Sequence, residues 1–429
     1  MRVLAYGRMV QFMLPLMVTM VVSGLMPQFL SGGIARGSQP TETLAAFALA
    51  FGLVDFLASP LSQVRQLGLV LVGDRRQALQ VLRFVVTCAI GLMIVLGALA
   101  LSEVGRYVVE DLHETTPELA RVVRLALLLL IPYPMLDTLQ RWLSGLLMRV
   151  RRTEVVSAGM LCGIGASLFT VFLAVPSALV RDTPIALPLL VTYVGVLTNT
   201  LILGAGVARY VRPGLTEGTG EDLSFKYLGR FFWPLALTMS IQGLSRPLVN
   251  VFISRGLHGE QALAALAVVY GLAHLPYGWL NELRSLASVF QEHGASGLRK
   301  IRRFACTCGA LSFAMMVVSF WVPVVRDLLL LDVLALPPQL AVRCHVPLML
   351  FTFFPLTVAL RGYFQGIALL ERRTTALAPS APARIGAILA MLMFVPETWM
   401  TGATRGVAAL FSGFFVEAIV VWWFVHARR

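Results

Sequence analysis

Residues 12–37 read FMLPLMVTMVVSGLMPQFLSGGIARG, and residues 231–256 read FFWPLALTMSIQGLSRPLVNVFISRG. Both stretches are apolar, carry a proline near the start and end on Arg-Gly, and each exceeds the roughly 20 residues that a helix needs to cross a bilayer. Placing Phe12 on Phe231 aligns residues 12–71 with 231–290 without a gap and gives 20 identities over 60 positions. The chain is therefore expected to repeat a set of membrane-spanning helices.

A second block recurs at a slightly larger offset. It matches Pro134, Gly145 and Arg151-Arg152-Thr153 to Pro355, Gly366 and Arg372-Arg373-Thr374. Shared apolar composition produces scattered matches, but it does not produce a gapless register that includes rare arginines and prolines.

The composition places the chain among polytopic membrane proteins. Of 429 residues, 58% are hydrophobic and only 13% are charged, and the mean hydropathy of +0.80 excludes a soluble domain. The net charge of +13 is also typical of nucleic-acid binding, but in a membrane protein basic residues collect in cytoplasmic loops. The expected surroundings are a lipid bilayer, and no nucleic-acid partner is expected.

Twelve apolar stretches are long enough to span the membrane. They cover residues 9–34, 44–72, 81–101, 118–147, 154–176, 185–208, 229–254, 262–290, 302–325, 338–369, 375–396 and 402–426.

Basic residues in the loops between these stretches alternate from side to side, as the positive-inside rule requires. One side holds Arg2, Arg8, Arg75, Arg76, Arg149, Arg151, Arg152, Arg209, Arg212, Lys226, Arg230, Arg299, Lys300, Arg302, Arg303, Arg372, Arg373, Arg428 and Arg429. The opposite loops are acidic or mixed. Both termini are therefore predicted to be cytoplasmic.

The predicted fold is all-α, with twelve helices in two pseudo-symmetric six-helix lobes. Six is an even number, so both repeats have the same orientation and are related by an axis along the membrane normal. The lobes are residues 1–208 and 229–429, and a polar linker, residues 209–228, joins them on the cytoplasmic side. This is the geometry of a two-lobed alternating-access transporter.

The rest of the composition bears on location and chemistry. Only two of the 35 basic residues are lysines, which indicates a GC-rich bacterial genome and hence a bacterial inner (plasma) membrane. The N-terminus resembles a signal peptide, but its apolar run is too long and has an internal counterpart, so a retained first helix is predicted. The five cysteines lie in or beside apolar segments, which favours packing. No metal site, no cofactor and no enzymatic activity are expected.

Arginines inside the spans are the main candidates for a binding site, because a buried cation is costly and guanidinium groups bind carboxylates and phosphates. In span 229–254, Gln242, Arg246 and Asn250 are spaced four apart and share one helical face, between Pro234 and Pro247. These three side chains either face a cavity that binds an anion or only form hydrogen bonds that hold neighbouring helices together.

Span 262–290 carries a second group. Tyr277, Asn281 and Arg284 share a face at α-helical spacing and are expected to address one ligand. Glu282 points elsewhere, as a salt-bridge partner or as a proton acceptor.

Other charged residues in the spans are weaker candidates. Arg65 is the repeat partner of Arg284 and either adds positive potential or snorkels to the interface. Arg361 and Arg384 could line the cavity, where Arg361 would also add positive potential. Arg36 and Arg255 suit the mouth of the cavity or an interface. The acidic residues Asp55, Asp137, Glu282 and Glu417 are candidates for coupling or for salt bridges, with Asp137 pairing Arg141. His274 and His345 are isolated, and packing is their expected role.

Three long motifs resemble the progressive ankylosis protein family. They are WPLAL with SRPLVNVFISRGLHG at residues 233–259, HLPYGWLNELR at 274–284, and LAAFALAFGLVDFLASPLSQVRQLGLVLV at 44–72. The resemblance implies a place in the superfamily of multidrug and toxin extruders (MATE) and polysaccharide flippases. Animal members are associated with export of pyrophosphate, nucleoside triphosphate and citrate. Asp55 and Gln63 depart from the family's pattern, which leaves the substrate open.

These inferences predict a secondary transporter that exports a small multivalent anion, bound between the lobes by Arg246, Arg284, Asn250 and Tyr277. Its expected partners are the anion, the bilayer and a coupling proton or sodium ion. A flippase for a lipid-linked phosphate or glycan, and a non-transporting scaffold or receptor whose arginines pair internally, are the alternatives.

Overall fold

The computed structural model describes residues 5–24, 26–34, 39–111, 113, 115–218, 222–256, 258–334, 336–396, 399–400 and 402–426. Within these ranges every regular element is a helix and no residue lies in a strand. The predicted all-α class is confirmed.

The chain divides into two units whose boundaries follow the repeat. The N-terminal unit is Leu14–Phe232, and the C-terminal unit is Met1–Met13 with Trp233–Arg429. The boundary residues Leu14 and Trp233 are equivalent positions in the gapless alignment of the sequence repeat. As a result, α1 (Tyr6–Ser23) and α12 (Phe225–Gly243) each begin in one unit and end in the other.

Aromatic contacts anchor the beginnings of these two helices. The Phe12 ring of α1 packs edge-on against Phe290 of the C-terminal unit, with centroids 6.1 Å apart. The Phe232 ring of α12 packs in the same manner against Phe84 of the N-terminal unit at 5.8 Å. The first turns of α1 thus belong to the C-terminal unit, and the first turns of α12 to the N-terminal unit.

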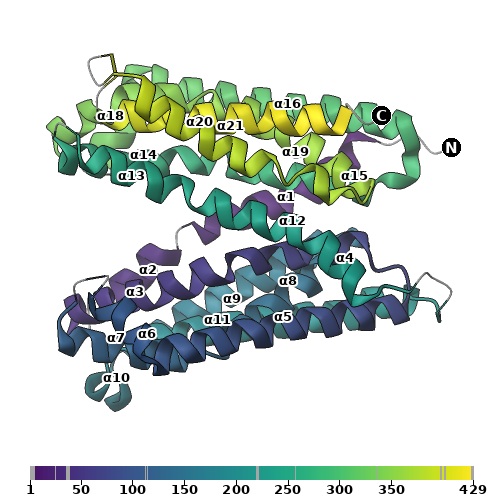
Figure 1. The fold of residues 1–429 in the computed structure, drawn as a ribbon, viewed down its shortest axis with the longest axis horizontal. Helices are drawn as coiled ribbons and strands as arrows, with labels where there is room; N and C mark the ends of the chain where they lie inside the picture. The colour runs from purple at the N-terminus through teal and green to yellow at the C-terminus, as the bar shows by residue number, and fades with distance from the viewer. Residues whose placement is uncertain are drawn as a thin grey trace. The chain divides into compact units, whose positions relative to one another are not determined.

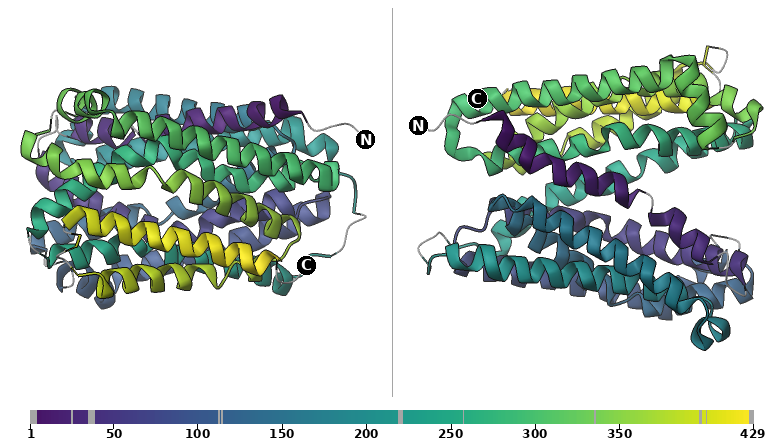
Figure 2. Two further views of the ribbon diagram at one scale, coloured as in Figure 1. Left: turned by 90° about the horizontal axis from the view of Figure 1, so that it is seen from above. Right: turned by 180° about the vertical axis from the view of Figure 1, so that it is seen from behind.

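The N-terminal unit is a bundle of long helices joined by short ones (Figure 1). Its buried apolar core joins α3, α5, α7 and α11, and α9 packs along α11 (Figure 2). Its further helices are α2 (Met26–Ile34), α3 (Pro40–Ala58), α4 (Val64–Val70), α5 (Arg75–Leu101), α6 (Glu103–Arg106), α7 (Pro117–Leu129), α8 (Tyr133–Arg149), α9 (Thr153–Ala174), α10 (Ala178–Asp182) and α11 (Ala186–Gly206).

The C-terminal unit repeats this plan with a polar centre. In it, α19 packs against α16 and α21, and α20 lies along α21. Its helices are α13 (Ser245–Ser254), α14 (Gly259–Tyr277), α15 (Leu286–Val289), α16 (Gly294–Trp321), α17 (Pro323–Asp327), α18 (Pro338–Phe351), α19 (Phe354–Leu370), α20 (Ser380–Phe394) and α21 (Gly402–His426).

Irregular helix geometry recurs at repeat-related positions in the two units. The 3₁₀ segments Ser59–Gln63 and Gly278–Ser285 begin at equivalent positions of the first repeated block. The π-helices Tyr107–Asp111 and Leu328–Val333 also begin at equivalent positions when the alignment of the second block is extended to them. Arg151 and Arg372 both adopt left-handed backbone angles, with φ of 62° and 54°. The repeat thus extends from amino-acid identity to local backbone conformation. The chain also contains a π-helix at Val207–Val211 and 3₁₀ turns at Arg212–Gly214, Gln291–His293 and Thr374–Ala376.

Ten described helices are long and apolar enough to cross a membrane, or eleven if the bent pair α7 and α8 is one span. The region predicted as span 229–254 is broken between Gly243 and Ser245, where α12 ends and α13 begins. Pro247 lies in the first turn of α13, where its missing N–H costs no helical hydrogen bond. The membrane location is supported, and the count of twelve spans stays a prediction.

The predicted linker, residues 209–228, contacts the start of α5. The backbone N–H of Arg75 donates to Thr216 O at 3.2 Å, and Arg76 pairs with Asp222 at 3.1 Å. Gln80 also donates to the Asp222 carboxylate. The described part of this segment is therefore fixed to the N-terminal unit.

Candidate anion site in the C-terminal unit

Two buried arginines in the C-terminal unit share a single carboxylate. Arg361 of α19 and Arg384 of α20 each donate from Nη1 to Oε2 of Glu417 on α21, at 2.9 Å and 3.1 Å. The Glu417 side chain is completely buried, and both guanidinium groups are nearly so. Three helices that are distant in sequence therefore meet at one ion-pair triad.

Two amides extend the triad into a network that we call the arginine cluster: Gln242, Asn281, Arg361, Arg384 and Glu417. Asn281 Oδ1 accepts from Arg361 Nη2 at 2.6 Å, and Gln242 donates to Oε1 of Glu417. Three residues of the cluster were predicted to bind substrate: Gln242, Asn281 and Arg361. The contacts join them to Glu417, which was predicted to serve in coupling or in a salt bridge. Arg384, whose place the sequence left open, belongs to the same network.

An aromatic ring supports the cluster from α21. The Phe414 centroid lies 3.9 Å from Cζ of Arg384 and 5.1 Å from Cζ of Arg361. Such contacts contribute about 2 kcal/mol or more when the cation is desolvated. Sequence reasoning missed Phe414, although its place one helical turn before Glu417 puts it on the same face.

The cluster holds more positive than negative charge. Its two guanidinium groups face one carboxylate, and the Nε groups of Arg361 and Arg384 are buried without a hydrogen-bond partner among the described residues. Removing charge from water costs several kcal/mol per ion unless it is compensated. The cluster therefore retains a positive potential and buried N–H groups that the described residues leave without an acceptor.

Arg246 of α13 is exposed and lies among aromatic side chains. Its Cζ is 5.0 Å from the Tyr270 ring centroid, and its guanidinium contacts the Tyr277 hydroxyl. Tyr277 also interacts electrostatically with Arg361 and Arg384. The side chain of Tyr277 therefore lies between the exposed arginine and the buried arginine cluster.

Residues near Arg246 contribute further polar atoms to this region. Asn250 Oδ1 and Ser245 Oγ on α13 are buried and have no hydrogen-bond partner among the described residues. The His274 ring lies edge-on to Tyr277, with centroids 5.2 Å apart. Tyr270, His274 and Tyr277 thus form a polar edge of α14 beside the α13 arginine.

The segment that carries Asn281, Glu282 and Arg284 is not the predicted α-helix. Residues Gly278–Ser285 form a 3₁₀ helix with three residues per turn. Asn281 and Arg284 are three residues apart and therefore share a face. Tyr277 is four residues before Asn281, so it does not lie on that face. Trp279 Nε1 and Asn281 Nδ2 donate to the carbonyls of Pro276 and Gly278, at 2.9 Å and 2.8 Å. Side-chain bonds to backbone compete with α-helical bonds in this way.

A polar group in the N-terminal unit has the opposite balance of charge. Arg141 Nε donates to Asp137 Oδ2 at 2.6 Å, the local pair that the sequence predicted. Gln140 donates to Asp137 Oδ1 at 2.8 Å, and Asp55 interacts electrostatically with both members of the pair. Asn199 of α11 donates to Gln140 Oε1 at 2.8 Å. Two carboxylates therefore accompany one arginine in this acidic cluster.

The remaining candidates lie apart from these contacts. Arg65 is half-buried on α4 in the N-terminal unit, and Arg255 is exposed at the end of α13. His345 on α18 lies 3.6 Å from Asp327, near the ion pair of Arg326 and Asp327. Arg36 lies outside the described residues.

Solved transporter structures share this fold. A mutant of the Vibrio cholerae MATE transporter VcmN matches 98% of this chain and 96% of that chain, with a TM-score of 0.71 and 11% identity. The eukaryotic MATE transporter AtDTX14 matches 98% and 95%, with a TM-score of 0.68 and 13% identity. A MOP superfamily transporter from Pyrococcus furiosus matches 98% and 95%, with a TM-score of 0.65 and 13% identity. The likeness establishes a MATE-like transporter fold.

The sequence family follows from a different comparison. The family model described as progressive ankylosis protein (ANKH) matches residues 2–322, three quarters of the chain. This range includes both copies of the first repeated block, the 3₁₀ segment Gly278–Ser285 and Arg246, although it ends before Arg361, Arg384 and Glu417. The chain belongs to the progressive ankylosis protein family.

Proposed function

We propose that this membrane protein is a secondary transporter that exports a small multivalent anion of the pyrophosphate, citrate or nucleotide class. The observation that carries the proposal is the cationic surplus of the arginine cluster, where Arg361 and Arg384 share the single carboxylate of Glu417. Paired guanidinium groups suit phosphate and carboxylate oxygens. A cavity that selected lipophilic cations would require the opposite charge.

Arg246 is the proposed direct ligand of the anion. Arg246 is an exposed residue, whereas the side chains of Arg361 and Arg384 are buried and already bonded to Glu417. Tyr277 and Asn250 would complete the polar contacts around it, and the buried arginines would supply long-range attraction. Arg284 and Arg65 remain proposed contributors to this positive potential.

The acidic cluster in the N-terminal unit is the proposed site of the coupling proton or sodium ion. Asp55 and Asp137 outnumber Arg141, so a bound cation would balance the group. In this scheme the anion and the coupling ion bind to different units, and a conformational equilibrium links them.

Transport by the purified protein in proteoliposomes tests the proposal. We expect uptake of pyrophosphate or citrate that changes when a proton or sodium gradient is imposed. Arg246→Ala is expected to lower the rate about 100-fold, since a lost charge-assisted hydrogen bond costs up to about 3 kcal/mol. Arg343→Ala is the matched control, because Arg343 is also exposed in the C-terminal unit but lies on α18.

Each outcome has a distinct meaning. Normal transport by Arg246→Ala would remove Arg246 from the site, and absence of transport of every polyanion would contradict the proposed function. Thermal-shift measurements with citrate, pyrophosphate, nucleotides and lipid phosphates complete the test. Stabilisation by lipid phosphates alone, lost in Arg246→Ala, would point to a flippase, and no stabilisation at all to a scaffold.

A further inference from the structure

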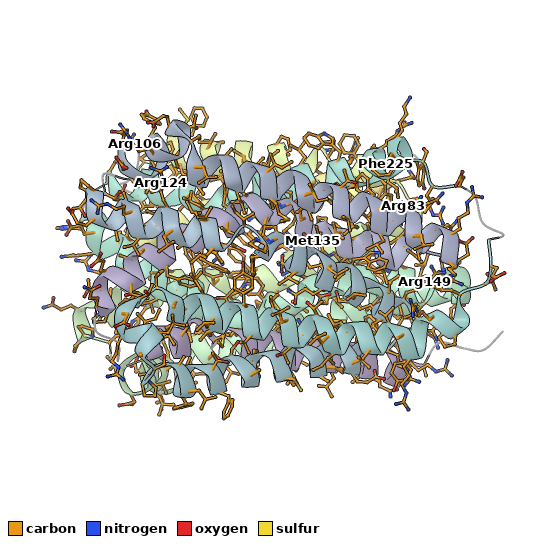
Figure 3. All side chains as sticks on the ribbon, turned by 90° about the horizontal axis from the view of Figure 1, so that it is seen from below. Arg83, Arg106, Arg124, Met135, Arg149 and Phe225 are labelled. Carbon is orange, nitrogen blue, oxygen red and sulfur yellow. The ribbon has the colours of Figure 1, made fainter. Side chains whose placement is uncertain are left out.

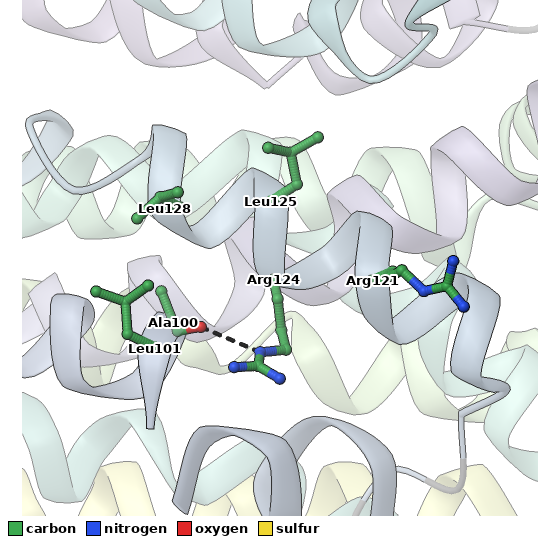
Figure 4. Close-up of a pocket in the computed structure, with 6 residues that line it drawn as sticks. All are labelled: Ala100, Leu101, Arg121, Arg124, Leu125 and Leu128. Carbon is green, nitrogen blue, oxygen red and sulfur yellow. Dashed lines mark hydrogen bonds between the residues drawn. The ribbon is translucent and has the colours of Figure 1, made fainter. Parts of the chain in front are cut away.

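A pocket of about 240 Å³ lies in the N-terminal unit, between the end of α5 and α7 (Figure 4). It is lined by Ala100, Leu101, Arg121, Arg124, Leu125 and Leu128. Pockets that enclose drug-sized molecules measure roughly 300–1,000 Å³. This one suits a small charged group whose remaining atoms lie outside.

Two arginines line the pocket, and in Figure 4 the Arg124 guanidinium lies beside the end of α5, whereas the Arg121 guanidinium extends away from the other lining residues. Arg124 Nε donates to the carbonyl of Ala100 at 3.1 Å, which fixes the side chain to the last turn of α5. Within the described residues, no ion pair or further hydrogen bond involves Arg121 or the Nη atoms of Arg124. No carboxylate lines the pocket. Guanidinium donors are therefore available to an anion.

The apolar part of the pocket faces outward. Leu101 is 68% exposed on α5, a candidate membrane span, and Leu125 and Leu128 are 41% and 39% exposed on α7, which forms a bent candidate span with α8. Such exposure is unfavourable in water and favourable against acyl chains. The pocket therefore combines a cationic end with a surface suited to lipid.

The position of the pocket along the helices corresponds to a membrane surface. α5 crosses from Arg75 to Leu101, and the pocket lies at its far end. Figure 3 shows Arg106 and Arg124 at one end of the unit and Arg83 and Arg149 towards the other. Arginines at the end of a span lie at the depth of lipid headgroups.

The pocket is not a consequence of the repeated fold. α7 begins at Pro117 and α18 at Pro338, so the register that places Pro134 on Pro355 also holds here. In this alignment the positions equivalent to Arg121 and Arg124 are occupied by Val342 and His345. The arginine pair therefore occurs in only one of the two repeats.

We propose that this pocket binds an anionic phospholipid, with the headgroup phosphate between Arg121 and Arg124 and an acyl chain along Leu101, Leu125 and Leu128. The phosphodiester accepts a hydrogen bond from the Arg124 guanidinium, and a second from Arg121 when this exposed side chain turns toward the pocket. A lipid of net negative charge is preferred over a zwitterionic lipid, because no carboxylate in the pocket would hold a positively charged headgroup.

Lipid retention by the purified full chain tests this site. The protein in detergent is mixed with phosphatidylglycerol, with phosphatidylcholine or with inorganic phosphate, and bound lipid is counted by native mass spectrometry. We expect phosphatidylglycerol to be retained preferentially. Arg121→Gln/Arg124→Gln is expected to bind it about 30-fold more weakly, at about 1 kcal/mol for each arginine near a lipid headgroup.

Two further variants keep the result interpretable. Arg181→Gln removes an exposed arginine of α10 outside the pocket and should bind phosphatidylglycerol like the wild type. Arg121→Gln alone leaves the Arg124–Ala100 bond intact, and should weaken binding about fivefold even if the double variant does not fold. Equal binding of both lipids, unchanged retention in Arg121→Gln, or displacement of the lipid by inorganic phosphate would overturn the proposal.

Discussion

At the scale of single residues, Glu417 has the largest structural consequence. Within the described residues it is the carboxylate that pairs with both Arg361 and Arg384, and its side chain has no exposure to solvent. Removing one partner of a buried ion pair costs about 3–5 kcal/mol, because the remaining charges stay buried. We therefore expect Glu417→Gln to lower the free energy of unfolding by about this amount, measured as a fall in the thermal unfolding midpoint in detergent.

A surface pair supplies the comparison for that measurement. Glu154 pairs with Arg152 at 3.0 Å, but both side chains are about half exposed, so Glu154→Gln should leave the midpoint unchanged. Equal midpoints for the Glu417 and Glu154 variants would show that the buried triad does not stabilise the fold. Pyrophosphate should raise the midpoint of the wild-type protein in the same assay, because binding to the native state stabilises it.

At the scale of helices, a glycine in each repeat allows close packing against the arginine-bearing span. A Cβ on Gly145 of α8 would lie 2.2 Å from the carbonyl oxygen of Arg65, and a Cβ on Gly366 of α19 would lie 2.7 Å from that of Arg284. Both contacts are with backbone, which cannot move without displacing a helix. In both repeats, therefore, a glycine allows close contact with the backbone of the repeat-related arginine.

Gly145→Ala is expected to destabilise the protein by about 1–3 kcal/mol, the usual cost of overpacking. Gly165→Ala on α9 is the control, since a Cβ there meets nothing within 4 Å and alanine favours helix by about 0.5–1 kcal/mol. Thermal unfolding of the two variants in the same detergent should therefore shift in opposite directions. A Gly145→Ala protein at least as stable as the wild type would contradict the packing argument.

At the scale of the whole molecule, the orientation in the membrane is open to a direct test. The predicted topology puts the arginine-rich loops in the cytoplasm. Fusions of a fluorescent protein and of alkaline phosphatase after Glu217 should give fluorescence without phosphatase activity. Fusions after Ser177, in the loop between α9 and α10, should give the reverse. The opposite pattern at both positions would invert the predicted topology.

Much of the architecture could be predicted because it rests on properties that are local in sequence. Long apolar stretches and alternating basic loops indicate a membrane protein, and the gapless register of residues 12–71 on 231–290 indicates the repeat. The local pairing of Asp137 with Arg141 also followed from spacing alone. The 3₁₀ conformation of Gly278–Ser285, in which Trp279 and Asn281 donate to backbone carbonyls, did not follow, because apolar composition does not distinguish a 3₁₀ helix from an α-helix.

By itself, the sequence determined the helical membrane class, the internal repeat and the surplus of arginine inside the spans. Only the tertiary structure decided which of those arginines act together. Arg361, Arg384 and Glu417 lie on three different helices, and no periodicity relates residues 33 and 56 positions apart. Their shared carboxylate is a consequence of how α19, α20 and α21 pack, because a buried charge must find its counter-ion in space rather than along the chain.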